Sequence, residues 1–420
     1  MSLPPLQLPT IQNWSCHNCS GCCRQHLIEI TEEERQRILG QKWTPEDGIL
    51  DGPVVVPHRS SLLKKSWRLA HAKDGGCVFL NDDGLCRIHA KFGEAAKPLA
   101  CRIYPYALHP AGKKVTVSLR FSCPSVVANL GKPVSENRDE LKKIERLVVP
   151  ENADRIPPPR VNKRETLDWP DTLKVIHALE ELLTDEDGGS VIECLFRALF
   201  VVGLVDQAQF GLIRGARLGD FLEIISEAAA AEEIPDSVQP ASVMRMQFRL
   251  LVAHYARKDT VVDLDAGLAG RWRLFRAATK FASGRGSATP LQNCFQEVPF
   301  EMMEQSFGEL PDEFEEILTR YLCVKLQGLH FCGPAYYDIP LVEGFRSLAL
   351  IVPAICWIAR WLAASDGRSV WTTEDLSKAM TIADHHHGYS PVFGSSGFRR
   401  RVNMLAKTDD LTRILLWYTR

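Results

Sequence analysis

Residues 14–25 read WSCHNCSGCCRQ, and this stretch decides how the first third of the chain folds. Cys16, Cys19 and Cys22 follow one another at a two-residue spacing, and a fourth cysteine comes directly after them. Thiolates at this spacing let one loop wrap a soft metal centre. Gly21 supplies backbone angles that other residues rarely adopt. The stretch therefore predicts a metal site.

Most of the remaining cysteines belong to the same part of the chain, since eight of the 13 lie within the first 123 residues. The opening residues lack the positive segment and continuous apolar segment of a secretory signal, so we expect a cytoplasmic protein. Cytosolic thiols are mostly kept reduced, which favours metal ligation over disulfides. The predicted metal ligands are Cys16, Cys19, Cys22, Cys23, Cys77, Cys86, Cys101 and Cys123.

The number and kind of metal stay open at this point. Side chains of adjacent residues such as Cys22 and Cys23 diverge, so one of them could serve a second centre. The later four cysteines are too far apart in sequence to form a local loop, so folding must gather them, and metal binding and folding are then coupled. Eight thiolates fit two four-cysteine zinc ions, two iron–sulfur clusters, or one cluster, such as 4Fe–4S, with spare cysteines. A purely architectural zinc site is the alternative to a redox-active or catalytic cluster.

Composition excludes several classes of partner. A chain of 420 residues with 45% hydrophobic content can bury the cores of two domains. Its net charge of -2 gives no field that would gather nucleic acid or coat an anionic membrane, so we expect neither partner. The most hydrophobic stretch, Ser347 to Ala359, lies between two arginines and is shorter than the roughly 20 residues that span a bilayer. It predicts a buried helix.

The pattern predicts a mainly α fold: a cysteine-rich, metal-bound N-terminal domain of short helices and loops (1–147), a proline-rich linker (148–170) and a larger all-helical domain (171–420). In the first domain, Thr31 to Glu34 forms a capping-box pattern that opens a helix through Leu39, and Val115 to Phe121 alternates like a strand. Apolar spacing predicts helices at Val191–Asp206, Phe221–Glu233, Ser242–Arg257, Leu268–Ala282, Asp312–Gly328, Val342–Ala364, Thr373–His385 and Arg400–Trp417.

No strand, glycine-rich turn and helix stand together as in a nucleotide-binding unit. Gly211, Gly215 and Gly219 occur at four-residue spacing, and we interpret them as small residues where helices approach closely. The loop Ser283 to Pro290 is expected to be a hinge or a surface crossing.

Several other residues can be interpreted as either functional or structural. Arg102 and Tyr104 flank a ligand and could donate hydrogen bonds to sulfur or simply fill space. His385-His386-His387 does not share one helical face, so a solvated helix end is favoured over a metal site. The His330 to Cys332 stretch is assigned to core packing. Four cysteines are interpreted as small buried hydrophobes: Cys194, Cys294, Cys323 and Cys356.

Ordered motifs in the first 127 residues resemble the CxxCxxCC cysteine-cluster family, often called YkgJ-like. They are Cys16-x-x-Cys19-x-Gly21-Cys22-Cys23, Cys77-x-Phe79-Leu80, Cys86-x-Ile88 and Cys101-Arg102-x-Tyr104-Pro105. His89 and Lys97-Pro98 depart from the residues common in the family, although neither change should alter the fold. The resemblance implies a zinc- or iron-chelating domain.

The spacer His89 to Cys101 resembles a subgroup that includes flagellin lysine N-methylases, which also carry a long helical C-terminal region. This resemblance implies methyl transfer to lysines of a protein such as flagellin, with S-adenosylmethionine as the donor. The competing hypothesis is a non-enzymatic zinc- or iron-binding or redox-sensing module. No catalytic residue follows from the sequence, because no residue pair outside the cysteine cluster has a spacing that demands chemistry.

Overall fold

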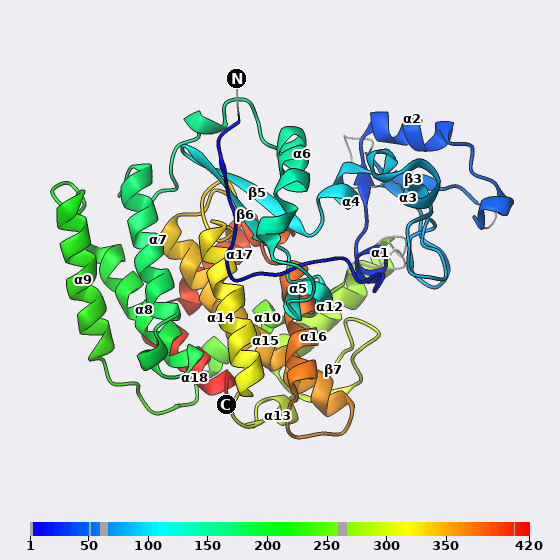
Figure 1. Ribbon diagram of the computed structural model, residues 1–420. Helices are drawn as coiled ribbons and strands as arrows, with labels where there is room; N and C mark the ends of the chain where they lie inside the picture. Colours follow the sequence, from blue (N-terminus) through cyan, green and yellow to red (C-terminus); the bar gives the residue numbers. More distant parts are fainter. Residues whose placement is uncertain (1–2, 50–51, 59–65, 259–266, 407) are drawn as a thin grey trace.

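The computed structural model describes residues 3–49, 52–58, 66–258, 267–406 and 408–420. The fold is mainly α, as the sequence predicts, with a few short strands in the N-terminal third (Figure 1). A small lobe carries most of the cysteine-rich segment and projects from one end of a large helical body. The molecule thus places its predicted metal ligands at the edge of the body.

The N-terminal third contains short elements. Its strands are β1 (Leu6–Gln7), β2 (Glu29–Ile30), β3 (Val55–His58), β4 (Ser66–Leu69), β5 (Tyr106–Ala111) and β6 (Lys114–Leu119). Its helices are α1 (Gly21–Gln25), α2 (Glu32–Gly40), α3 (Arg87–Phe92), α4 (Leu99–Ile103), α5 (Pro124–Val127) and α6 (Arg138–Val148). The strand predicted at Val115 to Phe121 is confirmed as β6. Thr31 and Glu34 form the predicted capping box, with Glu34 N donating to Thr31 Oγ1 at 3.2 Å.

The strands form two small sheets with different partners. In the lobe, β4 pairs antiparallel with both β2 and β3. On the body, β6 pairs antiparallel with β5 and parallel with β1, and Tyr106 lies opposite Leu119. The inward side chains of β6, Val115 and Val117, are fully buried. The β1-β6-β5 sheet therefore belongs to the body and leads the chain from the lobe into the helices.

The rest of the body is helical. Its helices are α7 (Trp169–Leu183), α8 (Val191–Gln207), α9 (Ala216–Ala230), α10 (Ser242–Ala256), α12 (Gly267–Ser283), α13 (Phe300–Met303), α14 (Asp312–Gln327), α15 (Leu341–Ser365), α16 (Thr373–Asp384), α17 (Ser396–Leu405) and α18 (Thr408–Tyr418), and β7 (Ser287–Ala288) pairs with β8 (Val298–Pro299). The predicted helix Arg400–Trp417 is wrong, because two separate helices replace it. Both α17 and α18 pack on α10 and α15, and α18 also packs on α8.

Helix α15 is the centre of the body and contacts α8, α10, α16 and α18. It is long and apolar enough to cross a membrane, yet the whole of its most apolar stretch is buried within the protein. The predicted buried helix is confirmed. Its close packing depends on Gly344, because a Cβ at this position would overlap the backbone oxygen of Phe331.

Two hydrophobic cores organise the described residues. The smaller one lies in the lobe and consists of Ile30, Ile38, Ile49, Val55, Leu69, Cys77, Phe79 and Ile88. The larger one extends from Leu6 to Tyr418 and includes the β1-β6-β5 sheet and α6. Val161 and Leu167, within the proline-rich segment, are buried in it as well. The predicted domain boundary at residues 148–170 stays a prediction. The two cores divide the residues before it, because some belong to the lobe and the others to the body.

The three glycines before and within the first turn of α9 do not mark a close approach of helices, so that interpretation is wrong. A Cβ at Gly211, Gly215 or Gly219 would meet no atom within 4 Å. Gly215 precedes α9 with a φ of 58°, a left-handed conformation that glycine adopts without strain. The predicted crossing at Ser283 to Pro290 holds β7 and buries Ala288 completely.

Candidate metal centre

The first four cysteines lie on a tight turn and a short helix at the inner side of the lobe. Cys16 and Cys19 are exposed, and the turn between them and α1 contains two residues with positive φ, Asn18 and Ser20. Helix α1 then carries Cys22 and Cys23, whose sulfurs are 4.0 Å apart. The expectation that adjacent side chains diverge is thus wrong here, since both sulfurs face the same region.

Three further cysteines are brought to α1 by the lobe. The backbone N–H of Cys77 donates to the carbonyl oxygen of Cys23 at 2.9 Å, and the chain then turns back so that Leu80 pairs with Cys86. Cys101 lies in α4, which contacts β2. Segments that are distant in sequence therefore meet beside α1.

The pKa values of these thiols indicate that they lie near one another. Burial raises the pKa of Cys77 to about 12, and the negative charges of Cys86 and Cys22 add to the rise. Burial also raises the pKa of Cys101, with further contributions from the charges of Cys77, Cys86 and Cys22. The hydrogen bond with Cys23, followed by burial, raises the pKa of Cys22. These five thiols form one group, which we call the inner cysteine group.

Cys123 stands in a different group. It precedes α5, and burial raises its pKa, with a smaller contribution from the charge of Cys19. The side chain of Tyr104 is near both groups: burial raises its pKa, and the charges of Cys123 and Cys22 add to the rise. Its hydroxyl is 3.2 Å from Ser122 Oγ. The arrangement is compatible with the sequence reading of two centres.

The geometry and the chemistry of the cysteines bear differently on metal binding. Among the described residues, no three histidine, cysteine or carboxylate side chains converge on a point where an ion would fit. The cysteines are free thiols, and mutual repulsion disfavours several thiolates side by side. A bound cation reverses that balance, because thiolate ligation releases the protons. Lys97, whose charge lowers the pKa values of Cys22 and Cys101, favours the same ionised form.

The segment that leads to Cys123, residues 119–123, is held by buried charges of the helical body. Asp384, at the end of α16, accepts a hydrogen bond from the backbone N–H of Ser122 at 3.0 Å and forms an ion pair with Lys325 at 2.7 Å. Lys325, in α14, also donates to the carbonyl oxygen of Leu119 at 3.3 Å. Both charged side chains are completely buried. The residue before Cys123 is thereby fixed to the body.

On the other side of Cys123, Arg320 forms hydrogen bonds with helix α5. Its guanidinium donates to the carbonyl oxygens of Val126, at 2.8 Å, and Val127. The same group donates to Gln12 Oε1 at 2.8 Å. Cys123 therefore lies between two points of attachment to the body. Asp384 of α16 holds the residue before it, and Arg320 of α14 holds the helix after it.

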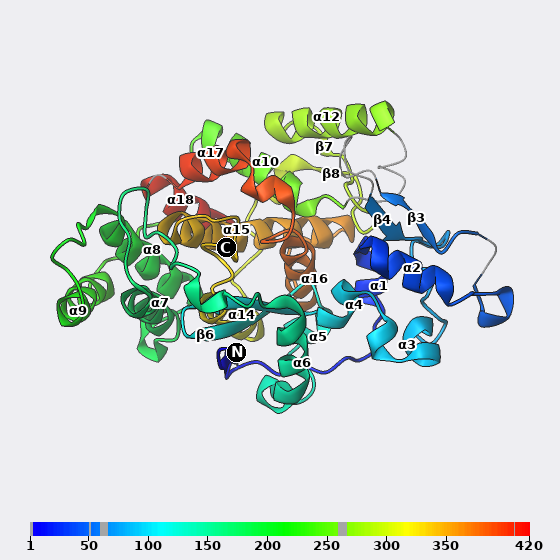
Figure 2. The same cartoon turned by 90° about the horizontal axis from the view of Figure 1, so that it is seen from above.

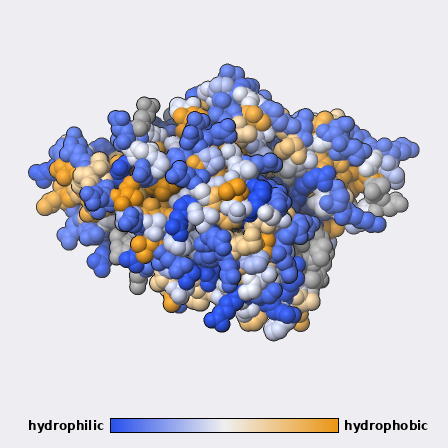
Figure 3. Space-filling view, turned by 90° about the horizontal axis from the view of Figure 1, so that it is seen from below, coloured by the Kyte–Doolittle hydropathy of each residue, from blue (hydrophilic) through white to orange (hydrophobic). Residues whose placement is uncertain are grey.

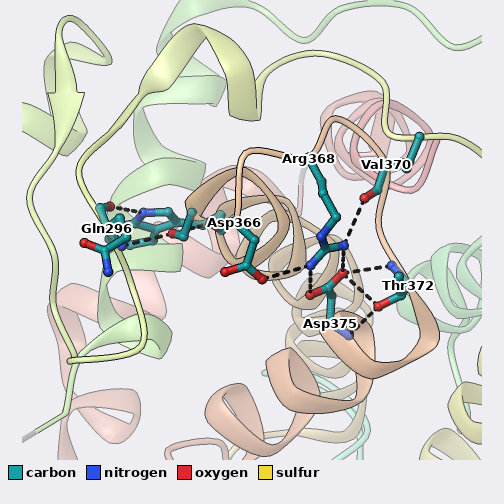
Figure 4. Close-up of polar contacts among 8 residues, drawn as sticks. Gln296, Asp366, Arg368, Val370, Thr372 and Asp375 are labelled. Atoms are coloured by element: carbon teal, nitrogen blue, oxygen red, sulfur yellow. Dashed lines mark hydrogen bonds and ion pairs between the residues drawn. The ribbon is translucent and has the colours of Figure 1, made fainter.

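Helix α16 is itself fixed at its start (Figure 4). Asp375 accepts hydrogen bonds from the Thr372 N–H at 2.9 Å and from the Arg368 guanidinium at 2.6 and 2.8 Å. Arg368 also donates to Asp366 at 3.1 Å. This network sets the register of α16, so that Asp384, at its far end, reaches the cysteine segment.

The histidines after α16 are not a solvated helix end, contrary to expectation. His387 is fully buried, and its Nδ1 is 2.9 Å from the hydroxyl of Tyr255. His385 stacks on His26, three residues after Cys23, with ring centroids 4.6 Å apart. The helix end is thus part of the contact between body and lobe. The burial of His330 and Cys332 confirms core packing.

The predictions for the remaining singled-out residues have different outcomes. Cys194, Cys323 and Cys356 are buried as predicted, whereas Cys294 is partly exposed. Arg102 approaches Glu94 at 3.9 Å, and only Tyr104 of the two flanking residues is linked to the cysteines. Sequence reasoning missed Lys325, although a lysine on the apolar face of a predicted helix is a signal of a buried ion pair. Its partner Asp384 carried no such signal.

Comparison with known proteins identifies the class of this region. Residues 15–124 match the model of the CxxCxxCC family, described as "Putative zinc- or iron-chelating domain". Residues 15–124 are thus similar to the CxxCxxCC domain, and the predicted resemblance is confirmed.

Relatives carry names that concern lysine methylation and flagella. Lysine-N-methylases of Salmonella typhimurium and Salmonella choleraesuis are each 26% identical over 119 residues, which cover 27% of this chain and 29% of the relative. Flagellar biosynthetic protein FliU of Salmonella muenchen is 25% identical over 123 residues, covering 29% of this chain and 72% of that protein. The match therefore spans less than a third of the two methylases. No solved structure matches the chain.

Proposed function

We propose that the inner cysteine group binds an iron–sulfur cluster, of the 4Fe–4S type, and that Cys123 with Cys19 and Cys16 forms the neighbouring ligand group. The observation that carries this proposal is the meeting of Cys22, Cys77, Cys86 and Cys101, which come from separate segments, in one electrostatic neighbourhood. Four thiolates are the usual ligand set of such a cluster. Zinc is the alternative occupant of the same sulfurs.

We further propose that the chain is a cytoplasmic protein-lysine N-methyltransferase whose substrate is a protein such as flagellin. The names of the relatives support this activity, and their similarity is confined to the cysteine region. S-adenosylmethionine would supply the methyl group. The residues of this chain would hold the metal centre beside Tyr104 and His26, at the contact between lobe and body, where a substrate lysine can be brought from solvent past the exposed Cys16 and Cys19.

A second function is favoured by the exposure of the first two cysteines. Cys16 and Cys19 are open to solvent, and exposed thiolates near a metal are where oxidants react first. A redox-sensing module would lose its metal reversibly and change its partner binding without turnover. Methyl transfer by the purified protein separates the two functions.

The first experiment measures iron, acid-labile sulfide and zinc in protein purified without oxygen. Cys77→Ser and Cys101→Ser should lose most of the metal, whereas Cys356→Ser, at a buried thiol in the body, should keep it. Iron with sulfide supports the cluster, and stoichiometric zinc without colour contradicts it. The metal-loaded protein is then incubated with labelled S-adenosylmethionine and flagellin. Absence of transfer with full metal content would contradict the methyltransferase and favour the sensing module.

A further inference from the structure

Helix α12 presents two apolar stripes on opposite sides. With 3.6 residues per turn, the inner stripe contains Gly270, Ala277 and Phe281, which are buried against the body. The outer stripe contains Leu268, Trp272 and Phe275, at i, i+4 and i+7. These three side chains are 82%, 62% and 58% exposed, and the two aromatic rings stack with centroids 5.5 Å apart.

Basic residues flank the outer stripe. The helix contains no acidic residue, and its spacing places Arg271 on one side of the stripe and Arg276 and Lys280 on the other. All three are exposed, and among the described residues their side chains form no ion pair. The net charge of -2 for the whole chain therefore conceals a local cationic surface.

The position of the helix limits what can cover it. Figure 2 shows α12 at the outer edge of the molecule, with α10 and β7 on its inner side. The outer stripe thus lies on the side of α12 opposite the one that packs on the body, and its three side chains are mostly exposed, so a peptide would have little to fit into. A bilayer surface needs no complementary shape, and it accepts Trp, Phe and Leu between arginines that face anionic headgroups.

From these observations we propose that α12 docks the protein on an anionic lipid bilayer, with Leu268, Trp272 and Phe275 inserted at the interface and the flanking cations on the headgroups. The helix lies along the membrane plane and does not span it. This peripheral contact would revise the expectation, drawn from net charge, that no membrane is involved. It does not depend on the metal centre or on methyl transfer.

Other exposed apolar residues provide a control. Figure 3 shows a largely hydrophilic face, with hydrophobic residues gathered toward the end of the molecule where α9 lies. There Ile224, in α9, is 64% exposed and Leu212, before this helix, is 80% exposed. Helix α9 carries three acidic residues, Asp220, Glu223 and Glu227, and a single basic residue. Leu212→Ala/Ile224→Ala thus removes exposed apolar surface without touching a cationic stripe.

The test is flotation of the full chain with vesicles of phosphatidylcholine alone or with roughly one-third phosphatidylglycerol. We expect binding only to the anionic vesicles, and loss of it in Trp272→Ala/Phe275→Ala. Arg271→Gln/Arg276→Gln should weaken it by roughly thirtyfold, because each basic residue near such a surface contributes about fivefold. The Leu212→Ala/Ile224→Ala control should bind as the wild type does.

Either of two kinds of result, in vesicle binding or in oligomeric state, would overturn the proposal. One is the absence of binding to anionic vesicles at moderate salt, or equal binding by the Trp272→Ala/Phe275→Ala variant. The other is a concentration-dependent dimer in light scattering that the same variant abolishes, which would assign the stripe to a second copy of the chain. Circular dichroism verifies that the variants are folded, which we expect because all substituted side chains are exposed.

Discussion

Replacing Asp384 with Asn tests whether the buried ion pair fixes the cysteine segment to the body. Asn has nearly the same shape, and its amide oxygen can still accept the hydrogen bond from the Ser122 N–H, which is 3.0 Å from the carboxylate in the native protein. The negative charge opposite Lys325, at 2.7 Å, is lost. The substitution therefore isolates the charge from the shape.

The expected magnitude follows from complete burial. Both side chains have no exposed surface, and burial already lowers the pKa of Lys325, against which the charge of Asp384 acts. Without Asp384, the lysine either stays charged without a partner or releases its proton, and both cost free energy. Breaking a buried pair by removing one partner costs about 3–5 kcal/mol, whereas replacing both partners with neutral groups is often close to neutral. Asp384→Asn should therefore be far more destabilising than Lys325→Met/Asp384→Asn.

The assay is urea unfolding of the three proteins at one fixed metal content, because metal loss would break two-state behaviour. Metal content after gel filtration is the second readout, and we expect Asp384→Asn to lose more metal than the double variant. Arg249→Met serves as the matched control, since Arg249 is buried and paired with Glu304 at 3.3 Å in the body. A cost below about 1 kcal/mol for Asp384→Asn, or an equal cost for the double variant, would refute the reasoning.

Three further predictions use other parts of the structure. Burial lowers the pKa of His254 to about 4, so its unfolded form binds more protons between pH 6.5 and pH 4, and this residue alone should lower the free energy of unfolding by about 1.4 kcal/mol per pH unit as the pH falls. Other buried histidines, such as His109, act in the same direction, so His254→Gln should reduce the slope in urea titrations by this amount, whereas His177→Gln, at an exposed position, should leave it unchanged. Gly344→Ala should cost more than about 3 kcal/mol by calorimetry, because its Cβ has no room, while Gly203→Ala, with open space, should be neutral or slightly stabilising. Chelation of the metal should speed proteolysis between Cys16 and Cys101 while the body stays protected, and uniform cleavage would contradict separate stability of the lobe.

The parts of the fold that could be predicted are those set by local sequence. The capping box at Thr31 depends on residues three apart, and α15 on a long apolar run with few interruptions. Both are recorded in contiguous residues, so they follow without tertiary information. The cysteine spacing from Cys16 to Cys22 is equally local, and it led to the family whose model matches residues 15–124.

Other features depend on contacts between distant segments and could not be read in this way. Lys325 and Asp384 are 59 positions apart, and each meets the cysteine segment some 200 or more residues earlier. The prediction for the histidines after α16 was wrong for the same reason, because a polar run that ends a helix has the composition of a solvated terminus. Only the packing of that helix end against His26 decides its burial.

The division of the cysteines between the lobe and a body-anchored segment has a mechanical consequence. Most of the inner cysteine group belongs to the lobe, while Cys123 is held by Asp384 on one side and Arg320 on the other. A metal that joined sulfurs from both groups would cross-link lobe and body, and its binding free energy would then also stabilise their contact. Two separate centres would leave the lobe free to respond to metal on its own. The extent to which chelation loosens the contact between His26 and His385 therefore distinguishes one shared centre from two.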